Sequence, residues 1–142
     1  MTMMVTFKVD ANPVGKQRAR YVKRGNFVST YTPEKTRTYE ALIRESAKQA
    51  MGESEPLETP VSLYLYIRVP IPASATKKRL KAISDGSEKP TKKPDASNIL
   101  KSVEDGMNSV VYRDDSQIVN IHVITVYSSV PGVDICVKEC LE

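Results

Sequence analysis

Five carboxylates gather between residues 95 and 115, where the chain carries only two bases and a local charge of −3. Asp95 opens this segment, and the pair Asp114 and Asp115 closes it. Oxygen ligands from separate segments suit a magnesium ion. A metal held in this way polarises a phosphoryl oxygen and lowers the pKa of a bound water, and Lys101 would neutralise charge on the phosphate or the leaving oxygen. One interpretation of the segment is therefore metal-dependent hydrolysis of a phosphodiester.

A helix over about 97–108 would position these groups. At 100° per residue, an apolar arc faces one side of this helix. It consists of Ile99, Leu100, Val103, Met107 and Val110. A polar stripe occupies the opposite side and consists of Asn98, Lys101 and Asp105. If the helix packs beside the strand that follows it, we expect Asp95 and Asp115 to converge on one point.

Each of these residues also has a purely structural interpretation. Asp95 is well suited to cap the helix, because aspartate is favoured at that position. Asp114 and Asp115 are typical of a turn before a strand. Lys101 and Asp105 are spaced as an exposed i,i+4 ion pair, which stabilises a helix by a few tenths of a kcal/mol. The spacing alone leaves both interpretations open.

The rest of the chain is basic, with a charge of +7 that leaves +4 overall. Lys16, Arg18 and Arg20 alternate, so in an extended segment they share one face. Residues 77–93 hold seven bases and two acids, and end in Lys92 and Lys93. Such clusters follow a phosphate backbone. We therefore expect these five residues to contact DNA, although a solvated surface would have the same composition.

The apolar patterns predict six strands and three helices. The strands are expected at 4–10, 21–22, 27–28, 61–69, 117–127 and 133–141, and the helices at about 33–51, 74–84 and 97–108. Residues 85–94 are rich in glycine, proline and charge, which predicts a flexible basic loop. The main order is strand, helix, strand, helix, strand, strand. It favours an α+β fold in which residues 1–142 form one domain, a mixed β-sheet with helices on one face.

Composition excludes several classes of protein. No apolar run approaches the roughly 18 residues of a membrane span, and the first residues lack a signal-peptide pattern. Two cysteines are too few for a disulfide framework, which favours a reducing, cytoplasmic location. His122 is the only histidine, so a metal site with two or more histidines is excluded. No motif for a small-molecule cofactor is apparent.

Two longer motifs resemble those of the RusA-type Holliday junction resolvases. The first is the run Lys93-Pro94-Asp95-Ala96-Ser97-Asn98-Ile99-Leu100-Lys101, followed by Asp105 and by Tyr112-Arg113-Asp114-Asp115-Ser116-Gln117-Ile118. The second is Pro13-Val14-Gly15-Lys16-Gln17-Arg18-Ala19-Arg20, which is similar to the basic N-terminal motif of that family. The resemblance implies a small α+β homodimer, common in phages and prophages. It also implies paired symmetric nicks in four-way DNA junctions with Mg²⁺, for which Mn²⁺ can substitute.

The resemblance also assigns roles residue by residue. It implies that Asp95, Lys101 and Asp115 are catalytic and that Asp95, Asp115 and the adjacent Asp114 bind the metal. The supporting residues would be Ser97, Asn98 and Asp105.

The chain departs from the family pattern at one position. Where the family has Asp-x-Asp-Asn, this chain has Ser97 in place of the second aspartate. The Ser97 hydroxyl would be either a weaker metal ligand or a cap for the helix. The departure keeps a second hypothesis open, a non-catalytic protein that binds junction or duplex DNA.

A homodimer would also need an interface, and the apolar strand residues Val133, Ile135 and Val137 are candidates for it.

Overall fold

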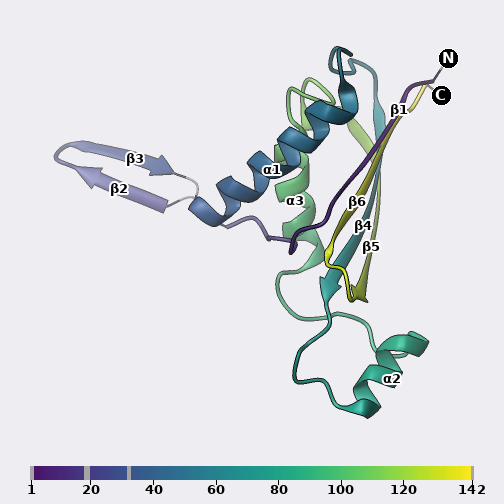
Figure 1. The fold of residues 1–142 in the computed structure, drawn as a ribbon. Helices are drawn as coiled ribbons and strands as arrows, with labels where there is room; N and C mark the ends of the chain where they lie inside the picture. Colours follow the sequence, from purple (N-terminus) through teal and green to yellow (C-terminus); the bar gives the residue numbers. More distant parts are fainter. Residues whose placement is uncertain (1, 18–19, 32, 142) are drawn as a thin grey trace.

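The computed structural model describes residues 2–17, 20–31 and 33–141, and its centre is a four-stranded mixed sheet. The strands are β1 (Met4–Val9), β4 (Val61–Pro70), β5 (Ile118–Ser128) and β6 (Gly132–Glu139), in the order β1-β6-β4-β5 (Figure 1). β5 lies parallel to β4, whereas β6 runs antiparallel to both β1 and β4. The sheet is therefore mixed, and the predicted α+β fold class is confirmed.

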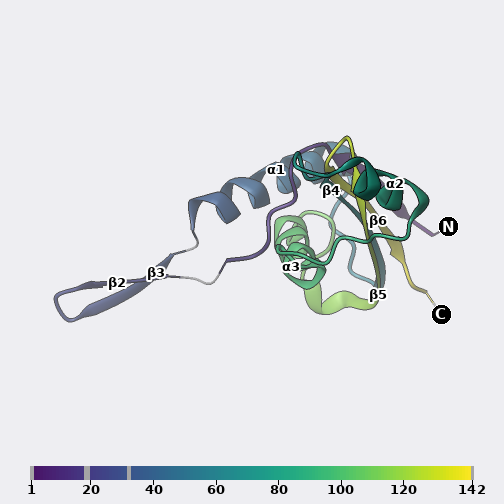
Figure 2. The same ribbon diagram turned by 90° about the horizontal axis from the view of Figure 1, so that it is seen from below.

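Two helices pack against one face of this sheet (Figures 1 and 2). They are α1 (Glu34–Met51) and α3 (Ala96–Met107). Every second residue of β1, β4 and β6 points towards them, as the two-residue period of a strand requires. The core contains Val5, Val9, Leu63, Leu65, Ile67, Val133, Ile135 and Val137 from the strands, and Tyr39, Ile43, Ala47, Ile99, Val103 and Met107 from the helices.

α1 and α3 approach each other closely at Gly106. A Cβ atom placed on Gly106 would lie 2.7 Å from Ile43 and 3.1 Å from the carbonyl oxygen of Glu40. Arg44 of α1 then donates to the carbonyl oxygens of Asp105 and Asn108, at 3.1 and 3.2 Å. These bonds supply side-chain partners for carbonyl groups at the end of α3. The contact fixes α1 beside the last turn of α3.

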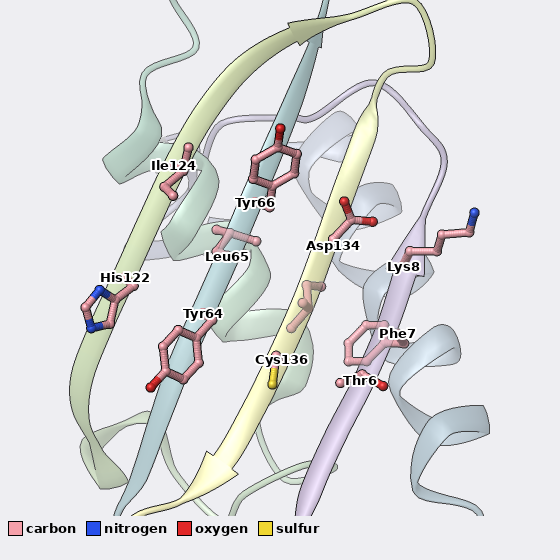
Figure 3. A pocket seen from close by; sticks show the side chains of 11 residues that line it. Thr6, Phe7, Lys8, Tyr64, Leu65, Tyr66, His122, Ile124, Asp134 and Cys136 are labelled. Carbon is pink, nitrogen blue, oxygen red and sulfur yellow. The ribbon is translucent and has the colours of Figure 1, made fainter.

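The predicted interface residues Val133, Ile135 and Val137 are buried between the sheet and the helices, so that prediction is wrong. The strand alternation identified two faces of β6, and the helices cover the face that carries these three residues. The opposite face of the sheet is uncovered (Figure 3). It bears Thr6, Lys8, Tyr64, Tyr66, His122, Ile124, Asp134 and Cys136 around a shallow depression of about 520 Å³.

Two further elements lie outside the two-layer body. The strands β2 (Arg20–Arg24) and β3 (Phe27–Tyr31) form an antiparallel hairpin that projects beyond the start of α1 (Figures 1 and 2). The short helix α2 (Lys77–Asp85) lies beyond the end of β4 and is capped by the Thr76 hydroxyl and followed by Gly86 in a left-handed conformation. Residues 86–95 connect α2 to α3 without a helix or strand. Of the helices in the described part of the chain, none is long and apolar enough to span a membrane.

The predicted elements agree with the observed ones to within a few residues. α1 begins at Glu34 instead of residue 33, because Pro33 has extended backbone angles and occupies the N-cap position. It ends at Met51, and Gly52 follows with a φ of 59°, which favours glycine. The hairpin turn contains Gly25 with a φ of 61°. Whether residues 85–94 are flexible stays a prediction.

Candidate active site

The first turn of α3 is fixed by Asp95. Its Oδ1 accepts a hydrogen bond of 3.0 Å from the backbone N–H of Asn98, which makes Asp95 the N-cap. Ile99, Val103 and Met107 are fully buried and anchor one side of the helix. Asn98 and Lys101 are exposed on the other side, as the polar stripe predicts. The capping role suggested for Asp95 is therefore confirmed, and the alternative in which Ser97 caps the helix is wrong.

A chain of alternating charges runs from α1 across α3 to the residues before β5. Lys16 Nζ lies 2.7 Å from Glu40 Oε2 and 2.9 Å from Asp105 Oδ2. The other oxygen of Asp105 lies 3.2 Å from Lys101 Nζ, which in turn lies 3.2 Å from Asp115 Oδ2. Two ammonium groups thus bridge three carboxylates, and the five side chains come from four separate segments.

The electrostatics of this chain keep both lysines protonated. Burial lowers the pKa of Lys101, but its hydrogen bonds with Asp105 and Asp115 outweigh burial, so the pKa lies above the ordinary value. The pKa of Lys16 is raised in the same way, against burial, by Glu40 and Asp105. Lys101 is therefore a fixed positive charge, well suited to neutralise a developing negative charge.

A single turn of 3₁₀ helix, η1 (Asp115–Gln117), positions Asp115. Asp114 caps this turn and accepts a 3.0 Å hydrogen bond from Ser116 N–H, and hydrogen bonds from Ser116 hold the pKa of Asp114 below its usual range. Gln117 Nε2 donates to the carbonyl oxygens of Leu57 and Thr59, at 2.8 and 2.9 Å. The turn before β5 is thereby tied to the segment that leads into β4.

Lys16 is positioned by close backbone contacts with α3. Its N–H donates to the Asn98 carbonyl at 2.9 Å. At Gly15, an added Cβ would lie 2.9 Å from Pro94 Cβ and 3.2 Å from Asn98 Cβ. Gln17 N–H donates to Thr36 Oγ1 at 3.2 Å. Residues 15–17 of the N-terminal basic motif therefore run between α1 and the start of α3.

The predicted site residues are only partly brought together. Lys101, Asp105 and Asp115 meet directly, whereas Asp95 lies six residues before Lys101, about 9 Å along the helix axis. Asp114 caps η1. Across residues 2–17, 20–31 and 33–141, no three histidine, cysteine, aspartate or glutamate side chains form a group that could hold a metal. The convergence of Asp95 and Asp115 on one point stays a prediction.

The predicted DNA contacts are scattered around this site. Lys92 and Lys93 are exposed just before the start of α3. Arg20 is the first residue of β2, and Arg18 falls outside the described residues. Lys16 is engaged by Glu40 and Asp105, so a contact between Lys16 and phosphate stays a prediction.

Sequence reasoning missed two residues that shape the site. Glu40 comes from α1, far from the acidic segment, and Gln117 was read only as part of a motif. One signal for Glu40 was available, because the buried side of α1 follows helical spacing through Tyr39, Ile43 and Ala47. Glu40 flanks that apolar stripe, where a long acidic side chain would reach the neighbouring helix.

Two comparisons with known proteins agree with the motifs. The family model described as Endodeoxyribonuclease RusA matches residues 10–138. The chain is also 32% identical over 137 residues to "Uncharacterized protein YqaN" of Bacillus subtilis (strain 168), a match that covers 95% of this chain and 96% of that protein. The matched region includes every residue of the charge chain.

Proposed function

The chain belongs to the RusA endodeoxyribonuclease family, and from this premise we propose that it resolves four-way DNA junctions by paired symmetric nicks. The reaction would serve DNA recombination and repair in the cytoplasm of a bacterial or phage-infected host, with a phage or prophage origin. The observation that carries the proposal is the contact of Lys101 with Asp115 and Asp105, since all three stand in the family motif. Just before the start of α3, Lys92 and Lys93 add exposed positive charge.

A divalent metal fits the chemistry of the residues at this site. Asp95 uses Oδ1 to cap α3, and Asp115 uses Oδ2 to contact Lys101, so each carboxylate has a second oxygen to offer. These two residues would hold Mg²⁺ or Mn²⁺, with Asp114 beside them. When bound, such a metal activates water and polarises the phosphodiester.

The residues of this chain supply the remaining steps. Lys101 would neutralise charge that develops on the phosphate or the leaving oxygen, because it is protonated and partly exposed. Asp105 acts as a positioning residue, since it holds Lys101 on one side and Lys16 on the other. Asn98 is exposed on the same stripe of α3 and would support the site from the first turn.

The DNA would follow the basic residues around the site. Lys92 and Lys93 precede the α3 cap and are exposed, and Arg20 is the first residue of the projecting hairpin. Contacts of this kind position the phosphate backbone and make affinity fall with salt.

A homodimer would match the two-fold symmetry of paired nicks. The uncovered sheet face supports this part of the proposal, because it exposes Tyr64, Tyr66 and Ile124. The flat area of a face made of four strands of about eight residues is on the order of 500 Å². This approaches the roughly 800 Å² of surface that each partner buries in a specific interface. The molar mass from light scattering should therefore be that of a dimer for the wild type and that of a monomer for Tyr66→Arg. A wild-type protein with the mass of a monomer would contradict the proposed dimer.

A second candidate function is a non-catalytic protein that binds junction or duplex DNA. The exposed, neutral Ser97 favours it, because the family pattern has a carboxylate there. Under this hypothesis, the protein binds junctions at every metal concentration and cuts none.

Cleavage of an end-labelled synthetic four-way junction separates the two functions. We expect two symmetric nicks with Mg²⁺ or Mn²⁺ and none in EDTA, while a linear duplex of the same sequence stays intact. A metal titration also tests Ser97, since Ser97→Asp should lower the metal concentration needed for half-maximal rate. Junction binding without cleavage at any metal concentration would favour the second candidate and overturn the first.

A further inference from the structure

The β2–β3 hairpin carries the two most exposed large apolar side chains in the described part of the chain. Phe27 is 79% exposed and Tyr21 is 77% exposed, and Val28 is also largely in solvent. The hairpin projects from the body in both views, so neither of its faces lies on the sheet (Figures 1 and 2). A two-stranded ribbon of this kind is marginally stable by itself. Its exposed aromatics therefore indicate a surface that a partner covers.

The charge of the hairpin identifies the class of partner. Residues 11–33 contain five bases and no acid. A second copy of this chain would present the same positive charge, whereas nucleic acid presents phosphates to the bases and flat π-faces to the aromatics. Nucleic acid is therefore the partner that satisfies both features.

The strand register places a base and an aromatic on each face. Arg24 is paired with Phe27 at the tip, so these two side chains share one face. Tyr21 and Lys23 lie two residues apart and share the other face. Five residues per strand give the ribbon a reach of about 17 Å. Each face can therefore contact a phosphate and a base at the same time.

We propose that this hairpin enters the four-way junction at its point of strand exchange, where Phe27 and Tyr21 stack on bases. The inference rests on the proposed function and deepens it, because it names the element that distinguishes a junction from a duplex. Inserting an apolar side chain into a continuous duplex requires unstacking a base step. At the exchange point the stacks already end, so the same insertion costs less there.

Binding is measured in EDTA, so that the DNA stays intact, on a four-way junction and on a linear duplex. Phe27→Ala should weaken junction binding about 5-fold to 150-fold, the range for one stacked base, and leave duplex binding within about 2-fold. The slope of affinity against salt should stay unchanged, because no phosphate contact is lost. Arg24→Gln should instead weaken binding to both the junction and the duplex, and it should reduce the salt slope by about 0.9.

A 2-aminopurine base reports the insertion directly. Wild-type protein should change its fluorescence when it is placed at the exchange point and not when it is placed in the middle of an arm. Phe27→Ala and Tyr21→Ala should reduce this change, Phe27→Tyr should retain it, and Val130→Ala, an exposed apolar residue in the β5–β6 turn, serves as the control.

The two proposals fail in different ways. Suppose that the wild type prefers junctions, and that Phe27→Ala has the same junction affinity and the same fluorescence change as the wild type. The hairpin proposal is then wrong and the proposed function stands. If the wild type binds a junction no better than a duplex, both proposals are wrong.

Discussion

Replacing Lys16 tests whether the charge chain holds the N-terminal segment to the helices. In Lys16→Met the chain loses an ammonium that is 26% exposed and contacts Glu40 and Asp105, which are 19% and 18% exposed. Exposed ion pairs contribute about 0.2–1 kcal/mol each, and removing one partner of a buried pair costs about 3–5 kcal/mol. The partial burial places Lys16→Met between these limits, at about 2 kcal/mol. For a chain of this length the melting temperature should fall by about 8 °C.

The assay is thermal and urea unfolding of Lys16→Met, Glu40→Gln and the double variant. A coupling energy of about 1 kcal/mol should appear in the cycle, because the two side chains are in contact. Lys8→Met is the matched control, since Lys8 is 69% exposed and its oxygen partner on Asp10 is 3.7 Å away. The control should change stability by less than about 0.5 kcal/mol.

The effect should also depend on pH in a defined direction. The raised pKa of Lys16 means that its stabilising contribution is complete below the ordinary lysine value of 10.5. It is lost as the pH rises through the raised value. The difference between wild type and Lys16→Met should therefore be constant from about pH 6 to 9 and shrink above pH 10.5.

A melting temperature equal to that of the wild type, with no coupling to Glu40, would refute the reasoning about Lys16. The predicted contact between Lys16 and DNA is tested separately by the salt slope of junction binding. A decrease of about 0.9 in that slope in Lys16→Met would mean that Lys16 contacts a phosphate, and an unchanged slope would remove it from the DNA surface.

Three further predictions concern packing, burial and charge. Burial raises the pKa of Glu104 above its ordinary value of 4.5, because it disfavours the charged carboxylate. Glu104→Gln should therefore raise the melting temperature at pH 7, and this gain should vanish below pH 4.5. An equal gain at all pH values would contradict this. Gly106→Ala should destabilise the protein by about 1–2 kcal/mol in urea unfolding, because contact with Ile43 outweighs the better helix propensity of alanine; an unchanged midpoint would show that α1 and α3 can separate freely. Lys92→Gln and Lys93→Gln should each weaken junction and duplex binding alike and reduce the salt slope by about 0.9; an unchanged slope would remove these residues from the DNA surface.

Local patterns predicted α3 well. The apolar spacing of Ile99, Val103 and Met107 identified the buried side, and the same spacing placed Lys101 and Asp105 together on the polar side. Asp95 precedes the first helical residue, so its capping role also follows from the sequence. These features depend on residues within a few positions of each other, which is where periodicity and capping rules apply.

Contacts between distant segments were beyond such rules. Glu40 and Lys16 join the site because Gly106 lets α1 approach α3, and no spacing along the chain encodes that approach. The strand at 133–141 was correctly predicted, but its apolar residues could not tell which face the helices cover, so Val133 was assigned to the wrong surface. Whether Asp95 and Asp115 face one metal likewise depends on how η1 meets the middle of α3.

Single-turnover cleavage of a four-way junction by Asp95→Asn and Asp115→Asn tests the central claim most directly. Each change removes one charge from the site and little from the basic surface, so junction binding in EDTA should stay within about 3-fold of the wild type. Cleavage with Mg²⁺ should fall by about 100-fold or more, whereas Glu45→Gln, on an exposed part of α1, should cut at the wild-type rate. If Asp115→Asn cuts the junction as fast as the wild type, the active site lies elsewhere and the account is contradicted.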